Sequence, residues 1–170
     1  MLNKLHEDQT LHILLKYGEH IAPPPGTIKL HQDVLKEHGS VWMGKFGKSI
    51  GKPVLKILKD QIKSKKPTYV FLVKSARGAY TIHAAKLEDI GLEADDDKLI
   101  PNYYQNRKSK IEIWFKINKI FQVKPEILET LKGYTSRMPI NQSVRRSMAG
   151  AFYVTLKDGQ MAENFKPTKK

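Results

Sequence analysis

Apolar residues recur at helical spacing in the first part of the chain. The leucines and isoleucines of Leu2–His20 predict a helix that ends before the proline run Pro23–Gly26. A second helix is predicted over Thr27–His38, with Thr27 as its N-cap and Gly39 closing its C-terminus.

A third helix is predicted to begin at Pro53, because the first turn of a helix accepts proline. One side of this helix is apolar and consists of Val54, Leu55, Leu58 and Ile62. The opposite side is basic and consists of Lys52, Lys56, Lys59 and Lys63. This basic side is either an ordinary solvated face or a surface for phosphate groups, and the pattern alone favours neither.

Continuous or alternating apolar runs predict the strands. These are Val41–Met43, Tyr69–Val73, Gly78–Leu87, Ile111–Val123 and Ala151–Leu156. Short helical segments are expected at Pro125–Leu131 and Asn141–Ser147. The mixture predicts an α+β fold built on a small, strongly curved sheet.

The two faces of Ile111–Val123 are distinct, because side chains alternate along a strand. The apolar face, assigned to the core, consists of Ile111, Ile113, Phe115 and Ile117. Trp114 lies on the other face, where it either packs under a helix or lines a pocket.

The composition agrees with a globular domain. The 170 residues are 40% hydrophobic and contain no cysteine, which excludes disulfides and thiolate metal sites and points to a reducing compartment. No apolar run approaches the roughly 20 residues that span a bilayer, and no signal-peptide pattern is present. We expect a soluble cytoplasmic protein that does not bind membranes.

The positive charge is large and unevenly distributed. The formal net charge is +13, and the stretch Ser40–Tyr80 holds ten Lys or Arg residues and one acid, Asp60. The acids collect instead between Glu88 and Asp97. Such segregation favours a basic face for a polyanion, most often nucleic acid, over a charge that serves solubility alone.

The segment Gly39–Lys52 combines aromatic and basic residues with glycines and has no acid. Trp42 is predicted to form the floor or wall of a base pocket, while Met43 and Phe46 either line that pocket or belong to the core. The predicted phosphate ligands of this segment are Lys45, Lys48 and Lys52. Further along the chain, Tyr103 and Tyr104 lie in a polar loop beside Arg107 and Lys108, where they either stack on bases or anchor the loop.

Catalytic motifs are not found. Gly47-Lys48-Ser49 resembles part of a P-loop, but the position five residues before Gly47 is Trp42 rather than glycine. The histidines have no zinc-ligand spacing, and Asp95-Asp96-Asp97 is more typical of a solvated acidic turn than of a cation site. The sequence therefore predicts a protein that is not an enzyme and that binds no metal or cofactor.

Several of these segments resemble a YTH domain. Val41-Trp42, the helix after it, Val70-Phe71-Leu72-Val73, the run from Ser75 to Leu87 and the strand from Lys110 to Val123 follow the order of its core. Val41-Trp42-Met43-Gly44 is also similar to prokaryotic EVE and YTH-like domains, which occur at the N-terminus of McrB-type modification-dependent restriction proteins. All of these belong to the PUA-like superfamily of small β-barrels flanked by helices.

The resemblance implies a reader of modified bases. Trp42 matches the tryptophan of the aromatic cage in that family. The implied base-binding residues are Trp42, Met43, Phe46, Ser75, Tyr103, Tyr104 and Trp114. The phosphate-binding residues are Lys45, Lys48, Lys52, Lys74, Arg77, Arg107, Arg145 and Arg146. The resemblance also implies a methylated base, DNA rather than RNA, base flipping, and association with an ATPase or nuclease effector in antiviral defence.

Three domain segments are expected. They are an N-terminal helix and proline-rich connector over 1–26, a PUA-like domain over 27–160, and a tail or linker over 161–170. Substitution of Trp42 by alanine is expected to abolish discrimination between modified and plain oligonucleotides while the fold stays intact. The alternatives are a general RNA-binding domain without a modification pocket, and a basic protein-interaction module.

Overall fold

The computed structural model describes residues 9–76, 78–136, 138–141, 144, 150–156 and 160–167. The strands are β1 (His12–Lys16), β2 (Val41–Phe46), β3 (Tyr69–Ala76), β4 (Ala79–Gly91), β5 (Ile111–Val123), β6 (Leu131–Gly133) and β7 (Ala151–Leu156). The α-helices are α2 (Thr27–His38), α3 (Lys52–Lys63) and α4 (Ile127–Thr130). The 3-10 turns are η1 (Asp97–Leu99), η2 (Asn102–Tyr104), η3 (Lys108–Lys110) and η4 (Ala162–Phe165).

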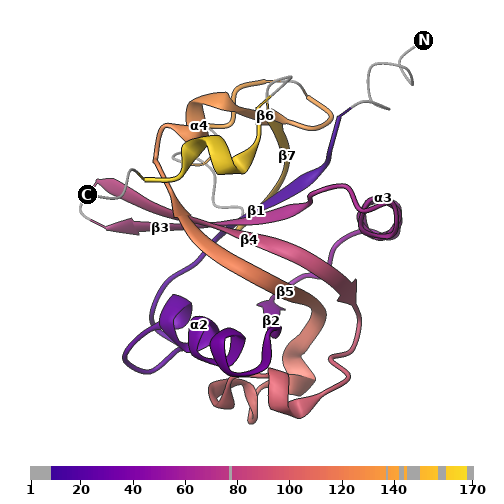
Figure 1. The fold of residues 1–170 in the computed structure, drawn as a ribbon, viewed down its shortest axis with the longest axis vertical. Coiled ribbons are helices and arrows are strands. Elements are labelled where there is room, and N and C mark those ends of the chain that lie inside the picture. The colour runs from indigo at the N-terminus through magenta and orange to yellow at the C-terminus, as the bar shows by residue number, and fades with distance from the viewer. Residues whose placement is uncertain are drawn as a thin grey trace. The chain divides into compact units, whose positions relative to one another are not determined.

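The strands form one mixed sheet in the order β2-β5-β4-β3-β1-β7-β6 (Figure 1). β1 runs parallel to β3 and antiparallel to β7, whereas β2 and β6 each pair antiparallel with one neighbour. The α+β class is therefore confirmed. Among the described residues the sheet is open, ending at β2 and β6, so a closed barrel is not seen.

The predicted N-terminal helix is wrong where the structure describes it. Residues 12–16 form β1, which is hydrogen-bonded on both sides and has Ile13 and Leu14 fully buried. A strand buried on both faces is continuously apolar, and such a run is hard to distinguish from a buried helix by periodicity. Residues 1–8 of the predicted helix lie outside the described part.

The chain divides into two compact units. Unit 1 comprises 1–17, 66–84 and 121–170, and unit 2 comprises 18–65 and 85–120. The core of unit 1 gathers side chains from β1, β3, β4, α4, β6 and β7. Ala162 of η4 is fully buried in this core, so the described part of the expected C-terminal tail is packed rather than frayed.

Unit 2 contains α2, α3 and β2 together with parts of β4 and β5. The helix α2 has the predicted bounds, and Gly39 ends it in the left-handed conformation at φ 84°. Thr27 is the first residue of this helix rather than its N-cap. The Glu19 carboxylate accepts a hydrogen bond of 3.0 Å from the Thr27 N–H. Glu19 therefore satisfies this backbone donor in place of an N-cap side chain.

The remaining elements largely follow the sequence. β5 has the predicted bounds, and its isoleucine-phenylalanine face is buried as expected. β2, β3 and β4 are longer than predicted, and the predicted helix 125–131 divides into α4 and β6. Of Asn141–Ser147 only residues 141 and 144 are described. No helix in the described part is long and apolar enough to cross a membrane.

Candidate nucleic-acid interface

Five aromatic side chains of unit 2 pack together, and we call them the aromatic cluster. They are Trp42, Phe46, Tyr103, Tyr104 and Trp114. β2 supplies the first two rings, η2 supplies the two tyrosines, and β5 supplies Trp114. The antiparallel pairing of β2 with β5 sets Gly44 opposite Trp114 and brings these strands into one register. The cluster therefore joins residues that are far apart in the sequence.

Tyr104 is the centre of the ring contacts. It stacks on Tyr103 with centroids 4.3 Å apart and on Phe46 with centroids 5.8 Å apart. Trp114 meets Tyr104 edge-on at 5.3 Å. Offset stacking and edge-to-face packing are the arrangements that aromatic quadrupoles favour, so the rings hold one another in fixed orientations.

A buried histidine of α2 positions Tyr104. The Nδ1 of His31 lies 2.7 Å from the Thr27 carbonyl, which can only accept, so Nδ1 carries the proton. Nε2 therefore accepts a hydrogen bond of 3.1 Å from the Tyr104 hydroxyl. Burial lowers the pKa of His31 to about 4 and raises the pKa of Tyr104 well above its usual value, so both groups are neutral at pH 7.

Trp42 is held from two sides by polar groups. Its indole N–H donates a hydrogen bond of 3.1 Å to Oδ1 of Asp95, which belongs to the acidic turn. The Lys116 ammonium lies 5.8 Å from the centroid of the Trp42 ring, and Glu88 lies 3.7 Å from the same ammonium. The acidic turn thus contacts the cluster through Asp95, while Asp95, Asp96 and Asp97 are all exposed, as expected for a solvated acidic turn.

Four of the predicted base-binding residues are buried. Trp42, Met43, Tyr104 and Trp114 are at most 4% exposed. Of the two alternatives for Tyr104, its burial favours anchoring of the loop, because η2 folds onto the cluster. The expectation that Trp42→Ala leaves the fold intact is corrected, since removing a buried tryptophan costs about 3–5 kcal/mol of stability.

Phe46 and Tyr103 are the half-buried rings of the cluster. Phe46 is the last residue of β2, directly before the loop that leads to α3. Two residues before Phe46, Gly44 allows β2 to pack closely against Ile111 and Trp114. A Cβ on Gly44 would lie 2.6 Å from Cδ1 of Ile111 and 3.1 Å from Cζ3 of Trp114, so a larger residue does not fit without displacement.

The cations of the same segment differ in their roles. The Lys45 ammonium is half-buried and bonds to the backbone carbonyls of Phe46 and Lys48, so it fixes the turn through Gly47. Burial lowers the pKa of Lys45. Lys48 and Lys52 are exposed. Arg107, which immediately precedes η3, is exposed as well.

The other predicted site residues do not belong to this group. Lys74 and Ser75 lie near the end of β3 in unit 1, where Lys74 is half-buried and Ser75 exposed. Arg77, Arg145 and Arg146 lie outside the described residues. Unit 2 thus brings together six of the predicted base-binding residues and four of the predicted phosphate ligands, and the binding roles of all of them remain predictions.

Each carboxylate of the acidic turn has a hydrogen-bond or ion-pair partner in the structure. Asp95 accepts from Trp42, Asp96 accepts from the Lys98 N–H at the start of η1, and Asp97 pairs with Lys108. Across the described residues, no group of three His, Asp or Glu side chains is arranged to hold a metal ion.

His31, Asp95 and Gly44 are the residues that sequence reasoning missed. His31 reads as one more polar position on an amphipathic helix, and its ring contact with Tyr104 depends on tertiary packing. Asp95 is one of three consecutive aspartates, and nothing in that run indicates which one accepts the hydrogen bond from Trp42. Gly44 is one of several glycines in Gly39–Lys52, and its close packing inside β2 is not evident from that composition.

Comparison with known proteins agrees with this architecture. The chain matches no curated protein and no solved structure. Its residues 13–151 match the Pua-like family, a span that contains the sheet from β1 to the start of β7 and the whole aromatic cluster. A family of this kind favours a nucleic-acid-binding module. Since the match covers most of the sequence, the chain belongs to the Pua-like family.

Proposed function

We propose that this chain is a non-catalytic nucleic-acid-binding module that holds a methylated base against the aromatic cluster of unit 2. One observation carries the proposal. Phe46 and Tyr103 are half-buried rings that both stack on buried Tyr104, and Phe46 leads directly into an acid-free loop with exposed Lys48, followed by exposed Lys52 at the start of α3. A flat, anionic ligand needs both of these features side by side.

The accessible rings are the ones assigned to the base. Phe46 and Tyr103 offer partly exposed aromatic surface, and Tyr104 supports both from within the unit. Trp42 and Trp114 are assigned to the rigid backing of this surface, because they are buried and already packed. A methyl group on the base adds apolar surface against aromatic rings, which favours the methylated form over the plain one.

The phosphates next to the base are assigned to Lys48 and Lys52. Both side chains are exposed and follow Phe46 within a few residues of chain. Arg107 follows the tyrosines in the same way. Lys45 is assigned to ordering the loop, since its ammonium already bonds to two carbonyl oxygens of that loop.

The finer parts of the proposal rest on the resemblance to YTH and EVE domains. It favours DNA over RNA, and a place beside an ATPase or nuclease effector in a restriction or defence system. A base in duplex DNA has to be flipped out of the stack at a cost of a few kcal/mol. Phosphate contacts by the exposed lysines would offset that cost.

A panel of oligonucleotides tests the proposal. Single-stranded and duplex DNA and RNA, each with and without methylated bases, are titrated against the purified chain at fixed salt. We expect tighter binding of one methylated species than of its plain counterpart. Equal affinity for all pairs would refute methyl recognition and favour the general RNA-binding alternative, and no binding at physiological salt would favour a protein-interaction module.

Phe46→Leu is the sharpest variant for this panel. Leucine keeps most of the apolar volume and removes the aromatic face, so the fold should survive while base stacking is lost. Stacking is worth about 1–3 kcal/mol per base, so affinity should fall by about 5- to 150-fold. Phe152→Leu on β7 is the matched control, because Phe152 is also half-buried but lies in unit 1. Equal losses in both variants would refute the role of Phe46.

A further inference from the structure

The two long helices of unit 2 carry very different charge. Both α2 and α3 have twelve residues. α2 has two lysines balanced by two acids, whereas α3 has four lysines and one acid, Asp60. If lysine were simply frequent throughout the sequence, both helices would carry similar numbers of lysines. The charge of α3 is therefore a local feature of this element.

The lysines of α3 form a single row, and we call them the lysine row. They are Lys52, Lys56, Lys59 and Lys63. At about 3.6 residues per turn and 1.5 Å rise per residue, they fall within an arc of about 60° and span about 16 Å along the helix axis. Their spacing of about 5–6 Å along the axis is regular enough to follow a line of evenly spaced anions.

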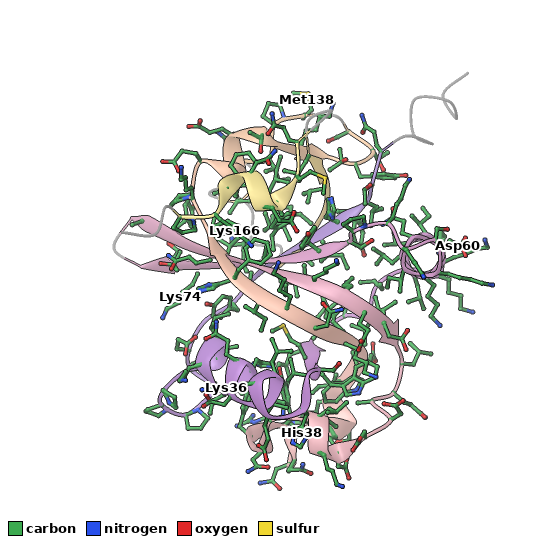
Figure 2. All side chains as sticks on the ribbon, in the orientation of Figure 1. Lys36, His38, Asp60, Lys74, Met138 and Lys166 are labelled. Carbon is green, nitrogen blue, oxygen red and sulfur yellow. The ribbon has the colours of Figure 1, made fainter. Side chains whose placement is uncertain are left out.

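The side of α3 opposite the lysines is largely covered. Leu58 is fully buried and Gln61 is 7% exposed, while Val54, Leu55 and Ile62 are half-buried. All four lysines are exposed. Figure 2 shows nitrogen-tipped side chains extending outward from α3 around the labelled Asp60. Because the apolar side is largely covered, the row is the most accessible part of α3 for a partner.

The row is almost free of competing acid. Lys56 pairs with Asp60 at 2.9 Å, an exposed contact within one helix. In the described part of the chain, Lys52, Lys59 and Lys63 have no ion pair. Exposed pairs such as Lys56 with Asp60 contribute little to stability, so a stronger anion can displace the carboxylate.

We propose that the lysine row is a track for the sugar-phosphate backbone of the nucleic acid whose base occupies the aromatic cluster. The row begins at Lys52, only a few residues after Phe46, and the loop between them holds a further cation at Lys48. Phosphates next to a base on Phe46 would meet Lys48 and Lys52 first, and the following ones would meet Lys56, Lys59 and Lys63. The track rests on the proposed function, which supplies the base.

Nucleic acid fits this row better than an anionic membrane does. A helix that lies in a bilayer interface inserts an exposed apolar face beside its cations. On the apolar face of α3, Leu58 is instead fully buried, and Val54, Leu55 and Ile62 are half-buried. A row of exposed cations beside a largely covered apolar face matches a phosphodiester line, which is bound mainly through charge.

The triple variant K56Q/K59Q/K63Q tests the track. Binding of a single-stranded oligonucleotide is measured between 50 and 200 mM salt. Each lost phosphate contact lowers the salt slope by about 0.7, so the variant should lose about 2 units of slope. Over this salt range, wild-type affinity should therefore fall about 15- to 20-fold more than that of the variant.

Two controls make the result specific. K29Q/K36Q/K98Q removes three exposed charges elsewhere in unit 2 and should leave the slope close to the wild-type value. Asp60→Asn removes the carboxylate that competes for Lys56 and should tighten binding, the opposite direction from the triple variant. Glutamine and asparagine at exposed helix positions change stability little, so all of these variants should fold.

The outcomes separate the track from the base site. A reduced slope without methyl preference would support the track and refute methyl recognition. Methyl preference with an unchanged slope in the triple variant would refute the track and leave the base site standing. An equal loss in both triple variants would also refute the track. Tighter binding to phosphatidylserine vesicles than to any oligonucleotide would overturn it in favour of a membrane surface.

Discussion

Stability should fall steeply as the pH is lowered from 7 to 5, because two histidines are buried in neutral form. His12 in unit 1 accepts a hydrogen bond of 3.1 Å from the Tyr69 N–H, and His31 in unit 2 accepts one from the Tyr104 hydroxyl. Burial lowers the pKa of His12 to about 3 and that of His31 to about 4. Protonation would place a charge in each core and remove the acceptor.

The sign and size of the effect follow from the two pKa values. A histidine in the unfolded chain takes up a proton near pH 6.5, whereas in the folded chain it does so only near pH 3 or 4. Each stabilising contribution is therefore complete above about pH 6.5. It is lost progressively as the pH falls from there to the folded pKa. At pH 5 each histidine should already have cost about 2 kcal/mol, and the two together about 4 kcal/mol.

Urea denaturation at pH 7 and pH 5 measures this loss. Circular dichroism follows the whole chain, while tryptophan fluorescence follows unit 2, which contains both Trp42 and Trp114. Since small domains are stable by about 5–15 kcal/mol, a loss of about 4 kcal/mol is a large fraction of the total. In His31→Gln the loss between the two pH values should shrink by about half. Equal stability at both pH values, or a folded-state His31 pKa near 6.5 by NMR, would refute the reasoning.

Two glycine substitutions probe separate constraints. Gly44→Ala should lower stability by about 1–3 kcal/mol in thermal melts, because the added Cβ would lie 2.6 Å from Ile111 and 3.1 Å from Trp114. An unchanged melting temperature would show that the neighbouring side chains can move aside. Gly39→Ala should cost about 1–2 kcal/mol through its φ of 84° alone, since nothing lies within 4 Å, and Gly39→Asn should cost less; the reverse order would contradict a backbone origin.

Local patterns were sufficient to predict some elements. α2 and β5 carry periodic apolar positions bounded by clear stop signals, such as Gly39 after α2, and their bounds agree with the structure. β1 was predicted as part of a helix because the apolar residues of Leu2–His20 recur at helical spacing, and the run at 13–15 does not alternate as a strand with one solvated face would. Its state depends on parallel pairing with β3, a long-range contact that no local window contains.

The candidate site was predictable in composition and not in burial. The aromatic and basic residues of Gly39–Lys52 identify the segment, but which rings remain accessible depends on the fold of residues far along the chain. Tyr104 and Trp42 are buried within the aromatic cluster, with His31 and Asp95 as their hydrogen-bond partners. Phe46 keeps partial exposure because it is the last residue of its strand.

The place of β1 in the sheet has a consequence for how the protein folds. β1 comes early in the chain, yet its neighbours are β3 on one side and β7, close to the C-terminus, on the other. During synthesis β1 therefore has an unpaired edge until β7 has left the ribosome. Loop closure over such separations slows folding, so we expect unit 2 to form first and the β1–β7 pairing to limit the rate.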